Sequence, residues 1–118
     1  MEFEVFLQNV GVDKEETLNR FAGMAKILEK FLLKFPEDPV YGSLLESIKK
    51  GSLEETELNM HTFKGVTGNL GLGKLHKLSA ESLERMRKNQ CMLSQTELEE
   101  IQQEYYRVIA VIREYRGE

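Results

Sequence analysis

Three absences limit what this 118-residue chain can be. Cys91 is the only cysteine, so no intramolecular disulfide can form. No apolar run is long enough for a signal-peptide core or a membrane span. The chain has 16 Lys and Arg against 20 Asp and Glu, a net charge of -4, so it has no basic cluster for binding nucleic acid or anionic lipid. We therefore expect a cytoplasmic protein that neither binds nucleic acid nor inserts into a membrane.

The remaining composition is that of an ordinary globular protein. Hydrophobic residues make up 41% and charged residues 31%, and the length suits a single domain over residues 1–118. The two histidines have no nearby cluster of cysteines or carboxylates, so we expect no metal site and no cofactor held by this chain. We also expect a monomer.

Apolar residues recur at helical spacing almost everywhere, which predicts an all-α fold. Capping boxes are predicted at Asp13 ("DKEE"), Ser52 ("SLEE") and Ser94 ("SQTE"), where a short polar side chain precedes a glutamate by three residues. Short connections favour an antiparallel up-down four-helix bundle. The predicted bundle helices run from Lys14 to Phe35, from Ser52 to the sequence "NLGLG", from Leu75 to Met86 and over about 95–116, with accessory helices near Phe3–Leu7 and from Val40 to a C-cap at Gly51.

The stretch "NMHTFKGVTGNLGLGKL", residues 59–75, carries four glycines close to a histidine. On a helical wheel of about 100° per residue, Gly65 and Gly68 fall within about 40° of His61, and Lys64 within about 60°. The apolar arc lies roughly opposite, so the wheel predicts that these four residues share a solvent-exposed face. The residues of the apolar arc are Met60, Phe63, Val66, Thr67 and Leu70.

Two glycines inside a solvent-exposed helix need an explanation, because each costs about 1 kcal/mol relative to Ala. Caps account for Gly71 and Gly73, but not for Gly65 or Gly68. A close helix crossing is the alternative, although the wheel places the apolar arc on the other side. We therefore expect Gly65 and Gly68 to form a docking surface that a partner approaches closely.

Other residues near this stretch have simpler interpretations. Leu58 points to the side of His61, where it belongs either to an apolar docking patch or to an interior contact with the N-terminal segment. His76 lies on a helix rich in charge and is expected to be solvated. Tyr105 and Tyr106 are expected in the core and at its edge.

The eleven residues "HTFKGVTGNLG", 61–71, resemble the signature of histidine phosphotransfer domains of two-component phosphorelays. The resemblance extends upstream through "GVDKEETLNRFAGMAKILEKFLLKF" and downstream through "KLHKLSAESLE", and it covers most of residues 10–90. Such domains are four-helix bundles, which agrees with the architecture predicted from periodicity.

The resemblance implies that His61 accepts a phosphoryl group from a receiver-domain aspartate and passes it to another. Lys64 would attract the phosphoryl oxygens, and Gly65 and Gly68 would let the receiver approach. Response-regulator receivers, and a hybrid sensor kinase, are then the expected partners. The receiver would supply Mg²⁺, and this chain would have no kinase activity of its own. The resemblance also implies a polar helper on the neighbouring helix, without singling out Ser79, Glu81 or Ser82.

A second function fits the same residues. A helical interaction module of the same fold could use the glycine face only to dock a partner, with no phosphorylation of His61. The two hypotheses differ in one observable, which is whether His61 takes up a phosphoryl group.

Overall fold

Side-chain caps begin three of the helices where the sequence predicts them. In the computed structural model, which describes residues 1–118, Asp13, Ser52 and Ser94 each accept a hydrogen bond from the N–H three residues on. The reciprocal bond of a capping box forms only at Ser94, whose N–H donates to the Glu97 carboxylate at 2.7 Å. The boxes predicted at Asp13 and Ser52 are therefore single caps, which still satisfy one otherwise unpaired N–H each.

The chain is all-helical, as predicted, and contains no strand. One isolated antiparallel bridge joins Val12 to Leu72. No helix combines the length and the apolar character needed to cross a membrane. The elements are α1 (Phe3–Val10), α2 (Lys14–Arg20), α3 (Ala25–Lys34), the 3-10 helix η1 (Phe35–Glu37), α4 (Val40–Lys50), α5 (Leu53–Asn69), α6 (Gly73–Asn89) and α7 (Gln95–Tyr115).

The single helix predicted from Lys14 to Phe35 is wrong, because the chain turns between α2 and α3. Ala22 and Gly23 both adopt positive φ, at 53° and 74°, and the Gly23 N–H donates to the Leu18 carbonyl at 2.8 Å. This is the left-handed geometry with which helices commonly end, and glycine adopts it without strain. The apolar spacing continues through the turn, so periodicity alone does not reveal it.

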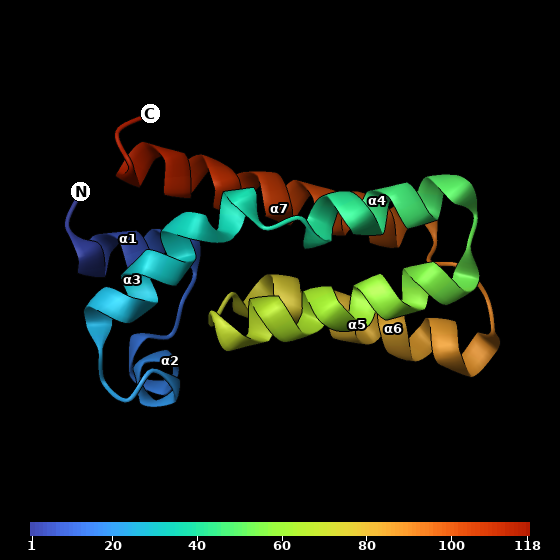
Figure 1. Ribbon diagram of the computed structural model, residues 1–118, viewed down its shortest axis with the longest axis horizontal. Helices are drawn as coiled ribbons and strands as arrows, with labels where there is room; N and C mark the ends of the chain where they lie inside the picture. The colour runs from blue at the N-terminus through green and yellow to red at the C-terminus, as the bar shows by residue number, and fades with distance from the viewer.

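Helices α4, α5, α6 and α7 run along the long axis of the molecule (Figure 1). Helix α5 packs against α4 and α6, and α6 packs against α7. The rings of Tyr41 on α4 and Tyr105 on α7 stack with centroids 3.6 Å apart, so α4 also contacts α7. The helix that begins at Val40 is therefore not the accessory that was predicted. The shorter helices α1, α2 and α3 gather at one end, where α1 packs on α7.

Fully buried core residues come from every helix except α2, whose partly buried Leu18 packs against them. Tyr105 belongs to the core, with its ring close to Phe35 and Phe63, whereas Tyr106 is 59% exposed. The prediction for Tyr105 is confirmed, and so is that for Tyr106, whose exposed ring meets the core rings of Tyr41 and Tyr105 edge-on. The largest side chains that are fully buried are Phe6, Phe63, Leu7, Leu28, Leu32, Leu44, Met60, Leu72, Leu75, Leu83, Met86 and Ile101.

The turn between α5 and α6 is fixed by a close approach to α2. Gly71 has a φ of 74°, and a Cβ added there would lie 2.1 Å from the hydroxyl oxygen of Thr17. Thr17 is buried, so it has little room to move. Both the backbone conformation and the space at this turn therefore require glycine.

Gly71→Ala should destabilise the protein more than Gly23→Ala, by about 1–3 kcal/mol, because overpacking is added to the same backbone strain. Gly23 is the matched control, since its φ is also 74° but nothing lies within 4 Å of a Cβ placed there. Urea unfolding of both variants measures the difference. Equal losses of stability would contradict a role for the Thr17 contact.

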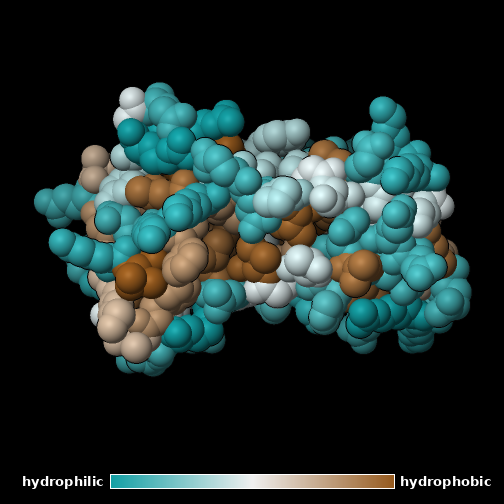
Figure 2. Space-filling model, viewed as in Figure 1, coloured by the Kyte–Doolittle hydropathy of each residue, from teal (hydrophilic) through white to brown (hydrophobic).

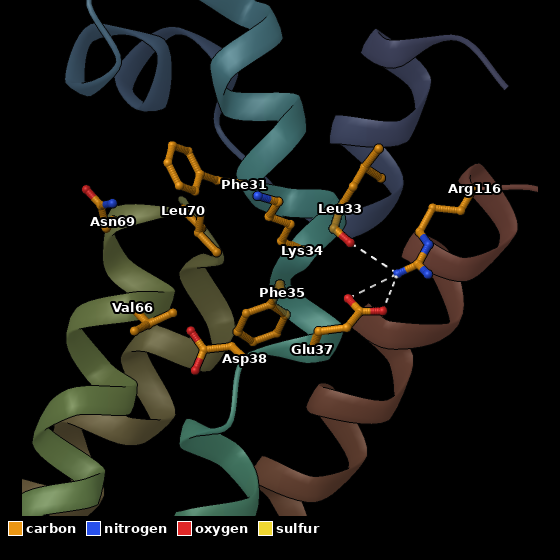
Figure 3. Close-up of a pocket in the computed structure, with 10 residues that line it drawn as sticks. All are labelled: Phe31, Leu33, Lys34, Phe35, Glu37, Asp38, Val66, Asn69, Leu70 and Arg116. Carbon is orange, nitrogen blue, oxygen red and sulfur yellow. Dashed lines mark hydrogen bonds and ion pairs between the residues drawn. The ribbon is translucent and has the colours of Figure 1, made fainter.

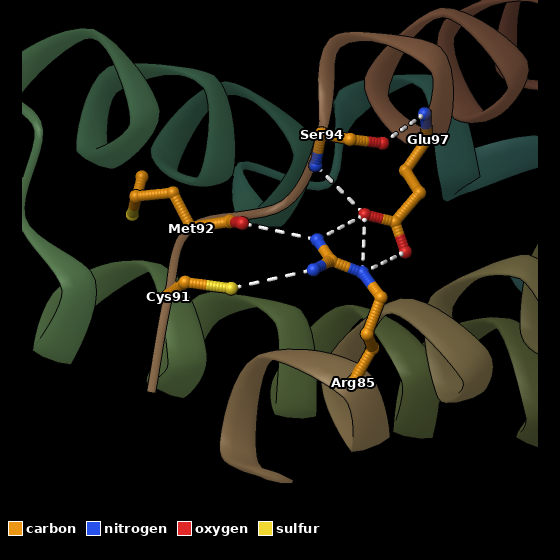
Figure 4. Close-up of polar contacts among 5 residues, drawn as sticks. All are labelled: Arg85, Cys91, Met92, Ser94 and Glu97. Atoms are coloured by element: carbon orange, nitrogen blue, oxygen red, sulfur yellow. Dashed lines mark hydrogen bonds and ion pairs between the residues drawn. The ribbon is translucent and has the colours of Figure 1, made fainter. Parts of the chain in front are cut away.

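Arg85 closes the connection between α6 and α7 (Figure 4). Its Nε donates to both carboxylate oxygens of Glu97, at 3.0 and 2.9 Å, and one Nη donates to the Met92 carbonyl at 3.0 Å. Burial would raise the pKa of Glu97, but hydrogen bonds from Arg85 and Ser94 outweigh it and hold this pKa below its ordinary value. The carboxylate therefore stabilises the fold in its charged form.

This stabilisation should be complete above about pH 4.3, the ordinary glutamate value, and should be lost as the pH falls through the lower pKa of the folded state. Glu97→Gln should thus be less stable than the wild type at about pH 7, with a difference that shrinks towards about pH 3. The free energy of unfolding in urea, measured between about pH 3 and about pH 7, tests this prediction. Substitution of the exposed neighbour Glu100 by Gln is the control. A difference that does not change with pH would contradict this role of Glu97.

Candidate functional site

Helix α5 presents His61 to solvent because the opposite side of the helix is buried. Met60, Phe63 and Thr67 have no exposed surface, and Leu70 is also in the core. His61 itself is exposed, and it takes part in none of the hydrogen bonds or ion pairs made by the residues around it. The orientation predicted by the helical wheel is therefore confirmed for His61.

The surface beside His61 is open on the side of Gly65. A Cβ added at Gly65 would meet no atom within 4 Å, and the residue is exposed. Leu58, one turn before His61, is 65% exposed. This exposure excludes the interior contact with the N-terminal segment and leaves Leu58 on the surface. Gly65 and Leu58 thus flank an imidazole that another molecule can approach.

Gly68 does not lie on an open surface, and this corrects the prediction for it. A Cβ added at Gly68 would lie 2.6 Å from Nδ1 and 2.9 Å from Cε1 of His76 on α6. Gly68 is half-buried, so it serves the close helix crossing that the wheel argued against. The wheel failed because it locates the apolar core but gives no information about a polar side chain that reaches across from a neighbouring helix.

His76 is likewise not the solvated side chain that was expected. It is half-buried, and its Nδ1 lies 2.9 Å from the backbone carbonyl oxygen of Lys64. Among the polar residues considered on α6, Ser79 is buried and donates to the Leu75 carbonyl, Ser82 is buried and Glu81 is exposed. The polar residue that α6 brings against the α5 face is therefore His76, which contacts Lys64 rather than His61.

Lys64 borders a polar hollow of about 520 Å³ between α2, α5 and the start of α6. Lys64 is half-buried and forms no ion pair with a carboxylate of the chain. No apolar side chain lines the hollow. Its lining residues are Gly11, Asp13, Glu16, Thr17, Arg20, Lys64, Gly65, Gly68, Asn69, Gly71, Gly73 and His76.

Arg20 is a residue of this site that sequence reasoning missed. Its Nη2 donates to the Gly68 carbonyl at 2.9 Å and its Nε to the Asn69 carbonyl at 3.3 Å. These carbonyls belong to the last turn of α5, where helical partners run out. Arg20 therefore ties the end of α2 to the end of α5. Nothing in the spacing indicates this contact, because the bonded residues lie 48 and 49 positions apart.

An apolar groove opens on the other side of α5 (Figure 3). Phe35 and Leu70 form its buried floor, while Val66 is half-buried and Phe31 is 47% exposed. The groove has a volume of about 740 Å³ and lies between α3, η1 and the second half of α5. Hydrophobic residues gather in a hollow near the middle of this face (Figure 2).

The rim of the groove is charged at both ends. Lys34 and Asn69 lie towards one end, and Asp38 and Glu37 towards the other (Figure 3). Arg116 pairs with Glu37 at 3.0 Å. Phe31 on α3 lies at the edge of the groove with its ring partly exposed (Figure 3).

No group of three or more His, Cys, Asp or Glu side chains is arranged to hold a metal ion. Comparison of the chain with protein-family models, with curated proteins and with solved structures gives no match. The function must therefore be argued from the residues of the site themselves.

The two glycines of the site should respond differently to substitution. Gly65→Ala should stabilise the protein by up to about 1 kcal/mol, because the position is helical and open. Gly68→Ala should be less stable than Gly65→Ala by at least about 1 kcal/mol, since the new methyl group displaces His76 from its hydrogen bond. The free energy of unfolding in urea gives both values.

A double-mutant cycle assigns the cause of that difference. In a His76→Ala background, Gly65→Ala and Gly68→Ala should have similar effects, because the ring that fills the space at Gly68 is gone. If Gly68→Ala is still less stable than Gly65→Ala in the His76→Ala background, some contact other than the His76 ring restricts Gly68.

Proposed function

We propose that this protein is a phosphocarrier of the histidine phosphotransfer type, in which His61 relays a phosphoryl group between receiver-domain aspartates. The observation that carries the proposal is the exposed His61 imidazole beside the open backbone at Gly65. A partner can reach the ring without displacing any side chain of this chain at that position. The resemblance of residues 61–71 to the histidine phosphotransfer signature supports the same assignment.

In the proposed reaction, this chain supplies the nucleophile. A nitrogen of the His61 imidazole attacks the phosphorus of an aspartyl phosphate, so an N–P bond forms while the O–P bond to the aspartate breaks and frees its carboxylate. The reverse step returns the phosphoryl group to a second aspartate. Histidine is one of the side chains that act as nucleophiles in covalent catalysis. Positioning and charge neutralisation are the main requirements of phosphoryl transfer.

Lys64 supplies positive charge from this chain. It lies one helical turn beyond His61, where residues three apart are neighbours, and it has no carboxylate partner to neutralise it. The ammonium is therefore available for a phosphoryl oxygen. In this proposal the receiver supplies the Mg²⁺ and the rest of the charge, as the resemblance implies.

The surroundings of His61 fit a protein partner. The exposed Leu58 offers apolar surface that a receiver domain could bury, and Gly65 leaves room for its backbone. The proposal includes the finer architecture, with α4 to α7 as the four-helix bundle and α1 to α3 as accessories. It also places the protein in the cytoplasm, with receivers or a hybrid sensor kinase as partners.

The apolar groove floored by Phe35 and Leu70 supports the second candidate, a docking module that is not phosphorylated. The two functions are separated by incubating the protein with receiver domains that carry an aspartyl phosphate. A phosphocarrier becomes phosphorylated in a form that is labile in acid and stable in alkali, as expected of phosphohistidine. A docking module binds a receiver without becoming labelled.

His61→Gln should abolish phosphoryl uptake and leave the fold intact, because the side chain is exposed and contributes little to packing. Label transfer from a phosphorylated receiver measures uptake, and urea unfolding checks the fold. His76→Asn is the control, since it removes the other imidazole of the chain but keeps an N–H donor, and it should still become labelled. Full labelling of His61→Gln would rule out this site.

Lys64→Ala should slow phosphoryl uptake about fivefold without abolishing it, because a single accessible charge contributes on the order of 1 kcal/mol. Lys77→Ala, an exposed lysine on the next helix, is the control and should transfer at the wild-type rate. The initial rate of labelling at fixed receiver concentration gives both values. Equal rates for Lys64→Ala and the wild type would exclude a role for this ammonium.

A further inference from the structure

His76 on α6 contacts α5 at two places one helical turn apart, the Lys64 carbonyl and the space over Gly68. Its Nδ1 is 2.9 Å from the Lys64 carbonyl oxygen, and its ring occupies the space over Gly68. The neighbouring α6 residues Leu75 and Ser79 are buried, which places His76 at the border between the core side of α6 and the polar hollow. The contact therefore joins α6 to the part of α5 that follows His61.

The chemistry of this contact fixes the state of the imidazole. A backbone carbonyl only accepts hydrogen bonds, so Nδ1 of His76 must carry a proton and donate it to the Lys64 oxygen. In the neutral ring, Nε2 is then the unprotonated nitrogen. The charged ring also has a proton on Nδ1, so the bond persists in both protonation states.

The segment that His76 contacts is a weak part of α5. Gly65 and Gly68 have no side chain to restrict the backbone, and glycine inside a helix costs about 1 kcal/mol relative to Ala. Contacts from outside the helix restrain it. His76 donates to the Lys64 carbonyl, and Arg20 donates to the carbonyls of Gly68 and Asn69.

The restraint from His76 acts on a residue of the proposed site. Lys64 carries the ammonium that we assign to the phosphoryl group, and the bond from His76 reaches the backbone of that same residue. Small displacements of a positioned group reduce rates sharply in group transfer. The geometry points to His76 as a positioning residue that holds Lys64 and the α5 backbone in register with His61. This inference rests on the proposed function of His61.

Two substitutions distinguish the contribution of the His76 hydrogen bond from that of the packing of its ring. His76→Asn keeps an N–H donor at the place of Nδ1 but loses the ring, whereas His76→Phe keeps a planar ring and loses the donor. Leu78→Ala is the control, because Leu78 is a partly buried residue of the same helix that packs on the core. It should lose stability by cavity formation without touching Lys64.

The readout is phosphoryl uptake from a panel of purified receiver domains charged with acetyl phosphate, measured over receiver concentration. His76→Phe should lower the rate at saturating receiver at least about tenfold and leave the half-saturating concentration unchanged, since docking is intact but the transfer geometry is not. His76→Asn should recover most of the rate. Leu78→Ala should transfer at the wild-type rate despite its lower stability.

Two solution measurements do not depend on phosphorylation. Nitrogen-15 spectra of the wild type should show the neutral His76 ring protonated at Nδ1, and amide hydrogen exchange at Gly65–Asn69 should be faster in His76→Phe than in the wild type. A neutral ring protonated at Nε2, or unchanged exchange, would overturn the inferred bond and with it the positioning role.

The outcomes distinguish the two proposals. If the wild type takes up phosphoryl groups and His76→Phe matches it, or if Leu78→Ala slows transfer as much as His76→Phe, the positioning role of His76 is overturned and the phosphocarrier stands. If the wild type takes up no phosphoryl group from any receiver of the panel, the phosphocarrier is overturned, and the positioning role falls with it.

Discussion

Burial of one face of α5 is the constraint on which the rest of the site depends. Met60, Phe63 and Thr67 are fully buried, and Phe63 sits within the aromatic cluster that joins α4 to α7. Turning α5 about its axis would expose these side chains, at a cost of about 1.5–3 kcal/mol for each large apolar one. The exposure of His61 on the opposite side follows from this packing, so the core itself holds the imidazole towards solvent.

Gly65, Gly68 and Gly71 look alike in the sequence but have different surroundings in the structure. At position 71, glycine is required by the left-handed backbone and by the closeness of Thr17. At position 68, it is required because the His76 ring fills the space of a side chain. Gly65 has no such requirement, since it is helical and open to solvent. Of these three glycines, only Gly65 therefore loses stability without an internal contact in return. The argument that a partner approaches this surface consequently rests on Gly65, and the internal contact of Gly68 removes it from that argument.

Much of the fold could be predicted from the sequence, because caps and apolar spacing are local signals. The starts of α2, α5 and α7 and the exposure of His61 are read correctly in this way. The break at Ala22 and Gly23 was missed, since the apolar spacing continues through it. The contacts of His76 and Arg20 could not be predicted, because each joins polar groups on different helices and depends on how those helices are placed in space.

The two sides of α5 differ in a way that bears on how a partner would be oriented. The apolar groove and the polar hollow both include Asn69 in their linings, so they meet at the end of the helix. The groove lies towards α3 and buries apolar surface, whereas the hollow lies towards α6 and contains Lys64 and Arg20. For a partner with one apolar and one polar surface, this arrangement would favour the orientation that places its apolar side chains in the groove and its polar ones over the hollow. The phosphocarrier proposed above would require a fixed orientation of its partner, since transfer requires the donor phosphorus to be aligned with the imidazole.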